Sequence, residues 1–339
     1  MTTRAFIAGC SGLELTHEEI SFFKEADPWG FILFRRNVDN PNQVRALCDA
    51  LRSISGRSDT PILIDQEGGR VQRMGPPHWP VYPRGRAYGQ LYSMDPTLGR
   101  EICRVAGRLI AHDLHSVGIN VDCLPVLDVP VAGAHDIIGD RAYSVDPATV
   151  AVLGRAAAEG LLAGSVLPVV KHIPGHGRAA ADSHEALPVV HTEREALEQR
   201  DFLPFRTLSD MPLAMTAHVV FTAVDPDRPV TTSTTAMRQI IRGSIGYDGL
   251  VMSDDLSMQA LSGSHRQRAE AAFAAGCDMA LHCNGQLEEM RAVAEASPPL
   301  TGEAKRRAET ALARIKHQPE PFDPVEARAR MEAALGRVA

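Results

Sequence analysis

One short stretch of the chain concentrates groups that can exchange protons. The apolar run 165–170 leads into Lys171 and His172, and a loop with two glycines and a proline then leads to Asp182 and His184. The run is typical of a buried strand, so Lys171 and His172 would lie at its carboxyl end, where parallel α/β folds place their catalytic groups. This concentration indicates a functional site; the alternative is a polar surface loop with incidental histidines.

Asp182 and His184 are separated by a single residue. On a loop, this spacing lets the carboxylate accept a hydrogen bond from the imidazole. The bond would fix the tautomer of His184 and stabilise an imidazolium, while the other ring nitrogen transfers a proton. The same spacing also fits an Asx turn, in which Asp182 only caps the backbone that follows.

A second pair of carboxylates, Asp254 and Asp255, follows the apolar run 250–252. One of them could attack an electrophilic carbon, and the other could cap the helix that follows. The alternative is that both are caps and neither takes part in chemistry.

Further polar side chains follow other apolar runs, and they would converge on one pocket if those runs closed into a barrel. Together they would form a dense array of hydrogen-bond donors and acceptors, which suits a ligand covered in hydroxyls, such as a sugar. The residues that would bind such a ligand are Asp65, Arg73, Arg141, Lys171 and His172.

Eight short apolar runs alternate with helix-like segments, which predicts an α/β fold of the parallel (β/α)8 TIM-barrel type. Near-continuous apolar strands fit a barrel because its strands are covered on both faces. The runs are Phe6–Ala8, Gly30–Phe34, Pro61–Ile64, Ile119–Pro125, Val166–Val170, Leu213–Ala217, Leu250–Met252 and Met279–Leu281. Helices are expected at 43–53, 97–116, 194–208 and 265–275. Two long non-helical segments, 75–89 and 130–144, would wall the mouth of the barrel.

The sequence shows no linker rich in glycine or serine, so residues 1–339 are expected to form a single barrel domain. Its core would span about 5–285, and a C-terminal helical extension over about 300–339 would pack outside the barrel.

Composition excludes several classes of function. A net charge of −7 without any basic stripe argues against nucleic acid as the main partner. The first residues lack the apolar core of a signal peptide, and no stretch approaches the length of a membrane span. The six cysteines are scattered without a C-x-x-C pair, which indicates free thiols in a reducing compartment and a cytoplasmic location. The oligomeric state cannot be determined from the sequence, and a monomer is favoured.

Two other motifs do not support cofactor chemistry. Gly175-His176-Gly177 lacks the G-K-[ST] ending of a phosphate-binding loop. His172, His176, His184 and His218 do not have the spacing of known zinc motifs, so no metal and no cofactor is expected. A metal-dependent hydrolase that uses these histidines is the alternative from another class.

Four motifs together resemble the family 3 glycoside hydrolases, and more narrowly their single-domain bacterial β-N-acetylhexosaminidase (NagZ-type) branch. They are Ile64–Arg73 (IDQEGGRVQR), Pro125–Val129 (PVLDV), Lys171–His184 (KHIPGHG followed by DSH) and Ser253–Met258 (SDDLSM). The resemblance covers about residues 5–285 and implies a (β/α)8 barrel that removes terminal N-acetylglucosamine with retention of configuration.

By motif position, the resemblance implies that Asp254 is the nucleophile and forms a covalent glycosyl-enzyme. His184 would be the general acid/base with Asp182 as its partner, in place of the second carboxylate that most glycosidases use. An imidazolium with a pKa near 6.5 can donate and then accept a proton with little perturbation. The loop 175–184 could be a mobile lid that carries His184 over the sugar.

The resemblance also implies that Asp65, Arg73, Arg141, Lys171 and His172 hold the sugar. The substrate of this branch is a muropeptide in which N-acetylglucosamine is linked to 1,6-anhydro-N-acetylmuramic acid, made during cell-wall recycling. The rival activities on the same scaffold are a β-glucosidase and a glycosyl phosphorylase, and a catalytically silent sugar-binding protein is a further alternative.

Overall fold

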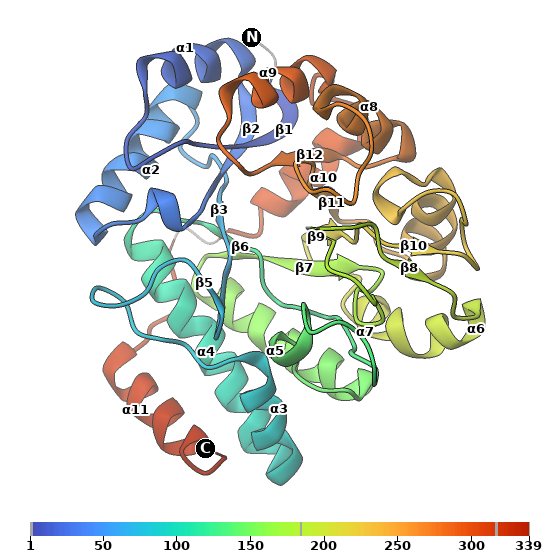
Figure 1. Cartoon of the computed structure of the whole chain (residues 1–339). Coiled ribbons are helices and arrows are strands. Elements are labelled where there is room, and N and C mark those ends of the chain that lie inside the picture. The colour runs from blue at the N-terminus through green and yellow to red at the C-terminus, as the bar shows by residue number, and fades with distance from the viewer. Residues whose placement is uncertain (1–2, 184, 316–317, 339) are drawn as a thin grey trace.

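The computed structural model of the chain describes residues 3–183, 185–315 and 318–338. Among these residues, eight parallel strands close into a barrel in the order β1-β12-β11-β9-β7-β6-β3-β2 (Figure 1). The barrel strands are β1 (Arg4–Gly9), β2 (Pro28–Leu33), β3 (Ile62–Ile64), β6 (Val121–Asp122), β7 (Leu167–Ile173), β9 (Leu213–Thr216), β11 (Leu250–Asp255) and β12 (Met279–His282). Each predicted apolar run overlaps one of these strands, so the predicted (β/α)8 fold is confirmed.

The strands are mainly apolar up to their carboxyl ends because alternate side chains enter two different cores. In β9, Leu213 and Met215 belong to the core inside the barrel, whereas Ala214 belongs to the core between the barrel and its helices. Both cores exclude water, so neither face of a strand can be polar. The carboxyl ends of the strands, where the inner core stops, are the places left for polar groups.

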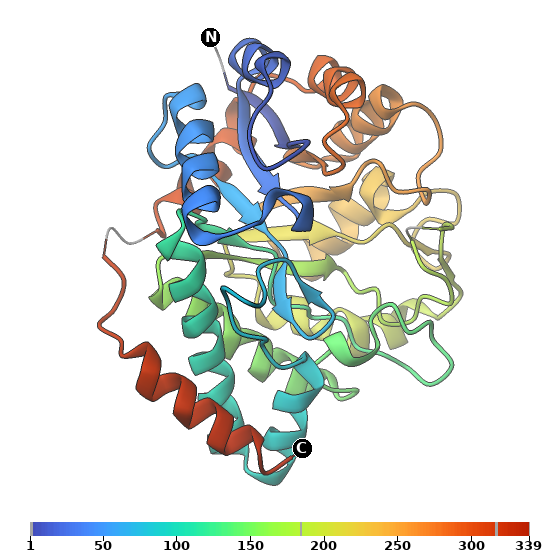
Figure 2. The ribbon, with the colours of Figure 1, turned by 60° about the vertical axis from the view of Figure 1, so that its left-hand side comes forward.

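Helices surround the barrel on its outside, as Figures 1 and 2 show. The α-helices are α1 (His17–Ala26), α2 (Pro41–Ser55), α3 (Gly85–Met94), α4 (Pro96–Ser116), α5 (Pro147–Ala163), α6 (Arg194–Ala196), α7 (Leu203–Thr207), α8 (His265–Ala275), α9 (Leu287–Ala296), α10 (Gly302–Leu312) and α11 (Pro324–Leu335). π-Helical segments cover Leu197–Asp201 and Ala236–Ser244, and short 3₁₀ turns cover Arg35–Asn37, Gly139–Arg141 and Val230–Thr232.

Two helical predictions need correction. The segment 75–89 is not wholly non-helical, because α3 begins at Gly85. A side chain at Gly85 would meet the carbonyl of Arg141, so this glycine serves close packing rather than a loop. The predicted helix 194–208 is divided into α6, a π-helical segment and α7, since the Pro204 ring cannot continue the preceding turn and instead begins a new one.

In the described ranges, two small sheets lie outside the barrel. β4 (Gln66–Gly68) and β5 (Val71–Gln72) form an antiparallel hairpin directly after β3. β8 (Val189–Val190) and β10 (Val220–Phe221) pair in parallel. The hairpin lies at the barrel mouth, where Glu67, Arg70 and Val71 face the space between the strand ends.

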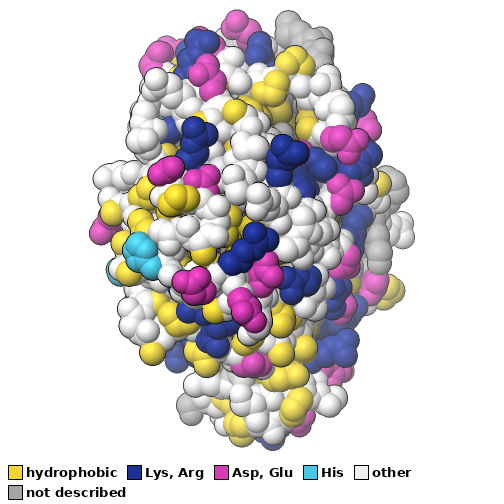
Figure 3. Space-filling view, turned by 90° about the vertical axis from the view of Figure 1, so that its right-hand side faces the viewer, with side chains coloured by type: hydrophobic (Ala, Val, Ile, Leu, Met, Phe, Trp, Pro, Cys, Tyr) yellow, Lys and Arg dark blue, Asp and Glu magenta, His cyan; other side chains and the backbone are white. Residues whose placement is uncertain are grey.

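The two C-terminal helices pack differently. α10 adds Ala308 and Ala311 to the core inside the barrel, whereas α11 lies outside the strands against α3 and α4 (Figure 2). Within the described part of the chain, no helix combines the length and apolar character needed to cross a bilayer. On the face shown in Figure 3, acidic and basic side chains are interspersed.

Candidate active site

The carboxyl ends of the barrel strands surround a cavity of about 390 Å³. The predicted ligand-binding residues and the predicted nucleophile all line it, although they come from segments far apart in the sequence. They are Asp65 after β3, Arg73 after β5, Arg141 in the 3₁₀ turn, Lys171 and His172 in β7, and Asp254 in β11. The structure therefore brings these six side chains to one pocket, and the segment 130–144 contributes to its wall through Ile137 and Ile138.

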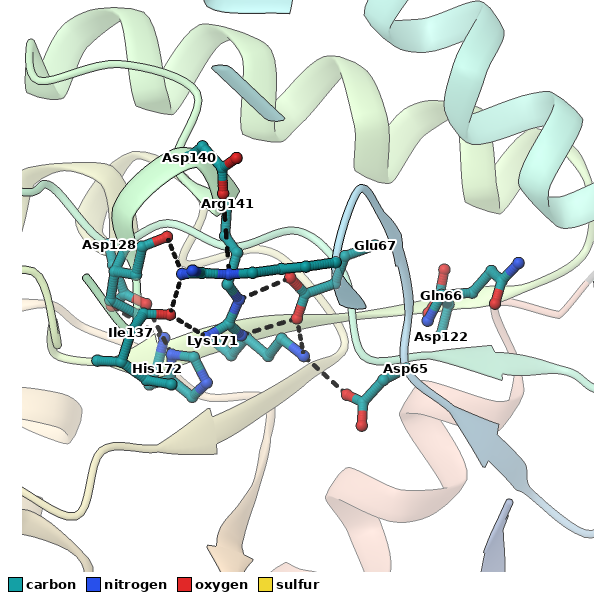
Figure 4. A network of polar contacts seen from close by, with 12 residues as sticks. Asp65, Gln66, Glu67, Asp122, Asp128, Ile137, Asp140, Arg141, Lys171 and His172 are labelled. Carbon is teal, nitrogen blue, oxygen red and sulfur yellow. Dashed lines mark hydrogen bonds and ion pairs between the residues drawn. The ribbon is translucent and has the colours of Figure 1, made fainter. Parts of the chain in front are cut away.

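An alternating chain of charges runs along one side of the cavity (Figure 4). Arg73 donates to Asp65 at 3.0 Å, and the Lys171 ammonium lies 2.8 Å from Asp65 and 2.7 Å from Glu67. The Glu67 carboxylate also accepts two hydrogen bonds from Arg141, at 2.8 and 2.9 Å. Glu67 was not among the predicted site residues, although it lies within the Ile64–Arg73 motif, because its place at the mouth depends on the β4–β5 hairpin.

This network fixes the protonation states of its members. Burial would raise the pKa of Glu67, but Arg141 and Lys171 outweigh burial and lower it to about 2. Burial likewise opposes ionisation of Asp65, yet Lys171 and Arg73 hold the pKa of its carboxyl well below the ordinary value. The pKa of Lys171 would fall on burial, but Asp65 and Glu67 raise it above its ordinary value. All three groups therefore remain charged at neutral pH.

Asp128, which follows the fourth barrel strand, β6, positions His172 and His176 through hydrogen bonds. It is fully buried, and one of its oxygens lies 2.6 Å from Nδ1 of His172. The other oxygen accepts the backbone N–H groups of His172 and His176, at 3.2 and 2.7 Å. With Nδ1 of His172 committed to Asp128, Nε2 is the nitrogen left for a ligand. Burial and the neighbouring His172 lower the pKa of His176 to about 4, so His176 is neutral.

Asp254 and Asp255 differ in what their carboxylates do. Asp255 accepts hydrogen bonds from the backbone and hydroxyl of Ser257, at 3.0 and 2.6 Å, and from the backbone of Cys283 at 3.1 Å. Asp254 lines the cavity, and its Oδ1 accepts the N–H of Asp255 at 2.8 Å. Both residues line the cavity, and the hydrogen bonds that Asp255 accepts order the turn after β11.

His218 supports the same strand end. It is fully buried, with Nδ1 2.7 Å from the hydroxyl of Thr231 and Nε2 3.1 Å from the backbone oxygen of Asp255. Burial lowers its pKa below the ordinary value. These contacts give His218 a positioning role beneath Asp254 and Asp255.

The described part of the loop 175–183 is attached to the barrel at several points. Arg178 forms an ion pair of 2.8 Å with Asp201, and the backbone oxygen of Gly177 accepts from Val131 at 3.3 Å. Ser183 is buried and lines the cavity, and its Oγ lies 3.2 Å from Nε2 of His176. Asp182 is half-buried on this loop. His184 lies outside the described residues, so its pairing with Asp182 and the mobility of the loop stay predictions.

A barrel whose strand ends present carboxylates and a charged hydrogen-bonding network to a cavity of this size is typical of an enzyme that binds a polar small molecule. The chain belongs to family 3 of the glycosyl hydrolases: the family described as "Glycosyl hydrolase family 3 N terminal domain" matches residues 11–317.

Named relatives narrow the class. The chain is 40% identical over 280 residues to a β-hexosaminidase of Alkalilimnicola ehrlichii, covering 81% of this chain and 79% of that protein. A β-hexosaminidase of Pseudomonas aeruginosa PAO1 is 37% identical over 286 residues, covering 84% of this chain and 83% of the relative.

Solved structures agree with these relatives. NagZ from Neisseria gonorrhoeae, in complex with N-trifluoroacetyl-D-glucosamine, superposes with a TM-score of 0.84 and 30% identity over 99% of this chain and 97% of the other. A family 3 β-N-acetylglucosaminidase from Paenibacillus sp. FPU-7 gives a TM-score of 0.85 and 31% identity, covering 97% of this chain but 66% of that longer chain. The chain is thus a glycoside hydrolase of the β-N-acetylhexosaminidase type that acts on a small sugar substrate, as its motifs predicted.

Proposed function

We propose that the chain is a retaining exo-β-N-acetylglucosaminidase in which Asp254 is the nucleophile and His184, partnered by Asp182, is the general acid/base. The observation that carries this proposal is the placement of Asp254 in the same cavity as the Asp65–Lys171–Glu67–Arg141 network. The network would form hydrogen bonds with the hydroxyls of a terminal sugar, and Asp254 would face the anomeric carbon of that sugar.

In the first step, an Asp254 oxygen bonds to the anomeric carbon while the glycosidic C–O bond breaks. The leaving oxygen takes the proton of the His184 imidazolium, and a glycosyl-aspartate ester remains. In the second step, water attacks the same carbon, His184 takes a proton from that water, and the ester bond breaks. Two inversions at one carbon give net retention.

The network residues act by position rather than by proton transfer. The Asp65 carboxylate can accept hydrogen bonds from sugar hydroxyls, while Arg73 and Lys171 can donate to their oxygens. Because these groups already pair with one another, they hold their places before a ligand arrives. Little ordering is then required on binding, which favours catalysis.

The finer substrate assignment is a muropeptide, with N-acetylglucosamine linked to 1,6-anhydro-N-acetylmuramic acid, processed in the cytoplasm during peptidoglycan recycling. Recognition of the acetamide is supported by relatives named for N-acetylglucosamine and by the NagZ complex with an N-acylglucosamine analogue. A reducing compartment is supported by the cysteines, all of which are buried and unpaired with one another.

One assay separates this function from its rivals. The nitrophenyl β-N-acetylglucosaminide and the nitrophenyl β-glucoside are compared with and without phosphate and with and without EDTA. We expect cleavage of the first substrate alone, free sugar rather than sugar phosphate as product, and the same rate after EDTA treatment. Cleavage of the glucoside, formation of sugar 1-phosphate or loss of activity in EDTA would each select a different rival.

Asp254→Asn should lower kcat by roughly 10⁴-fold or more, because the replacement keeps the shape but removes the nucleophile. In the parent enzyme, mass spectrometry after rapid acid quenching should find one N-acetylhexosaminyl group on the peptide that contains Asp254. A label on any other peptide contradicts the assignment. His184→Ala should lose less activity on the nitrophenyl substrate than on an alkyl glycoside, since nitrophenolate leaves with little help from an acid.

A further inference from the structure

Two histidines and a glutamate lie together on the outer side of the barrel wall. In β12 and the residue after it, Leu281 and Cys283 line the sugar cavity, so the intervening His282 points the other way, toward the helices. His265 is the first residue of α8, and Glu289 lies in the first turn of α9. The three side chains therefore join one strand and two helices at a single point.

The geometry of this trio matches a metal coordination shell. The Oε2 atom of Glu289 lies 3.2 Å from Nε2 of His265 and 3.2 Å from Nε2 of His282. One potential ligand atom from each of the three residues lies within 4.8 Å of the other two. Zn²⁺ takes tetrahedral ligands at about 2.0–2.1 Å, which places neighbouring ligands about 3.3 Å apart. The two distances from Glu289 to the histidines thus already fit. A small rotation of the partly exposed His265 would bring its ring nitrogen to the same distance from that of His282.

The surroundings supply what a metal site needs. The Nδ2 group of Asn284 donates to Oε2 of Glu289 and so orients its carboxylate, a contact typical of the shell around a ligand. His265 and Glu289 are 25% and 34% exposed, so an ion can enter from solvent.

We propose that His265, His282 and Glu289 bind one divalent transition-metal ion, with Zn²⁺ chemistry, that ties α8 and α9 to β12. Two imidazoles and a carboxylate with a fourth position open to water are a ligand set that zinc accepts. The prediction from the sequence that no metal is bound was argued from the spacing of the histidines around the sugar cavity. It did not consider these three residues, because they are far apart in the sequence and only the fold brings them together. The role is structural, because the trio faces away from the cavity.

The test uses the 339-residue chain, stripped of metal with a chelator and then dialysed against ZnCl₂. We expect one equivalent of Zn²⁺ per chain by elemental analysis, and a rise in Tm of a few degrees at saturating metal. His265→Ala and Glu289→Gln should each weaken Zn²⁺ binding at least tenfold and abolish the rise in Tm. Both changes are at partly exposed positions, which avoids emptying the buried site of His282.

His17→Ala is the matched control. His17 is the first residue of α1, as His265 is of α8, and both follow a capping box that the substitution leaves intact. This variant should keep the bound metal and the rise in Tm. Co²⁺ in place of Zn²⁺ should give the strong visible absorption of a four-coordinate site in the parent protein and in His17→Ala, but not in the two ligand variants.

Absence of binding, or stoichiometric binding that survives both ligand variants, would overturn the proposal. Competition between bound Zn²⁺ and N-acetylglucosamine would also overturn it, since the ion would then be in the sugar cavity. His265→Ala and Glu289→Gln should cleave the nitrophenyl N-acetylglucosaminide at the parent rate. The outcome is therefore independent of whether the proposed catalytic roles are correct.

Discussion

At the residue scale, the site depends on a lysine that has almost no contact with solvent. The side chain of Lys171 is 3% exposed, and two carboxylates lie within 2.8 Å of its ammonium. Burial of a lone ammonium would cost several kcal/mol, so Lys171 can stay charged only because Asp65 and Glu67 are ionised beside it. Because these ion pairs hold cationic donors next to anionic acceptors, the site can both donate hydrogen bonds to a ligand and accept them from it. That combination suits a neutral sugar, whose hydroxyls do both.

Glu67→Gln tests this dependence. The substitution leaves Arg141 and Lys171 without the carboxylate between them, and breaking a buried ion pair costs about 3–5 kcal/mol of unfolding free energy. Urea denaturation measures the loss. The control is Asp136→Asn, which removes the exposed partner of Arg70 and should cost less than about 1 kcal/mol. Equal, small losses in both variants would show that the network contributes little to stability.

At the element scale, the loop 175–183 lies against the segment that follows the fourth barrel strand. A side chain at Gly177 would come within 2.2 Å of the backbone oxygen of Val129, so only glycine allows this approach. Gly177→Ala should displace the loop that leads to His184 and lower kcat on an alkyl glycoside by about 10²-fold, because small misplacements at a catalytic group are costly.

Gly12→Ala is the control for that substitution, since a side chain at Gly12 meets nothing within 4 Å. Steady-state kinetics and Tm are measured for both variants. An unchanged kcat in Gly177→Ala would mean that the loop position does not govern catalysis.

Elements with strong local patterns could be predicted from the sequence. All eight barrel strands were located because a strand buried on both faces is apolar over most of its length, and α8 was predicted with the observed bounds 265–275. The start of α3 was missed because Gly85 and Gly89 indicate a loop locally, whereas their lack of side chains serves contact with Arg141 and Tyr143. Such a requirement arises from tertiary packing and leaves no periodic signal.

The sequence indicated which residues lie at the site, but not which of them form ion pairs and hydrogen bonds with one another. Asp65, Lys171 and Asp254 were identified because each stands at the end of an apolar run. The central role of Glu67 depends on how the β4–β5 hairpin folds, and the hold of Asp128 on two histidines depends on the path of the chain after β7. Neither can be read from spacing alone.

At the scale of the whole molecule, the pKa shifts predict a protein that loses stability in acid. The pKa of His176 is lowered to about 4 and that of Glu67 to about 2, so the unfolded chain binds protons at both groups more readily than the folded chain. Stability from His176 is present above pH 6.5 and is lost as the pH falls toward 4. That from Glu67 is lost between pH 4.5 and 2. The buried Asp122, whose pKa is raised, acts in the opposite sense.

Urea unfolding between pH of about 7.5 and 5 isolates the histidine contribution. Stability should fall over this range, with His176 accounting for on the order of 2 kcal/mol. His176→Asn should make the fall shallower by about that amount. A slope identical to that of the parent would show that His176 does not titrate in this way.

The pairing of β1 with β12 closes the barrel, and its register joins Phe6 to Ala280. Because β12 is the last barrel strand along the chain, β1 lacks one of its two neighbours until β12 has been synthesised. Throughout that interval β1 is an open edge with unpaired N–H and C=O groups, which is the kind of surface that recruits other chains. During synthesis, the exposed edge of β1 therefore needs protection from other chains until β12 can pair with it.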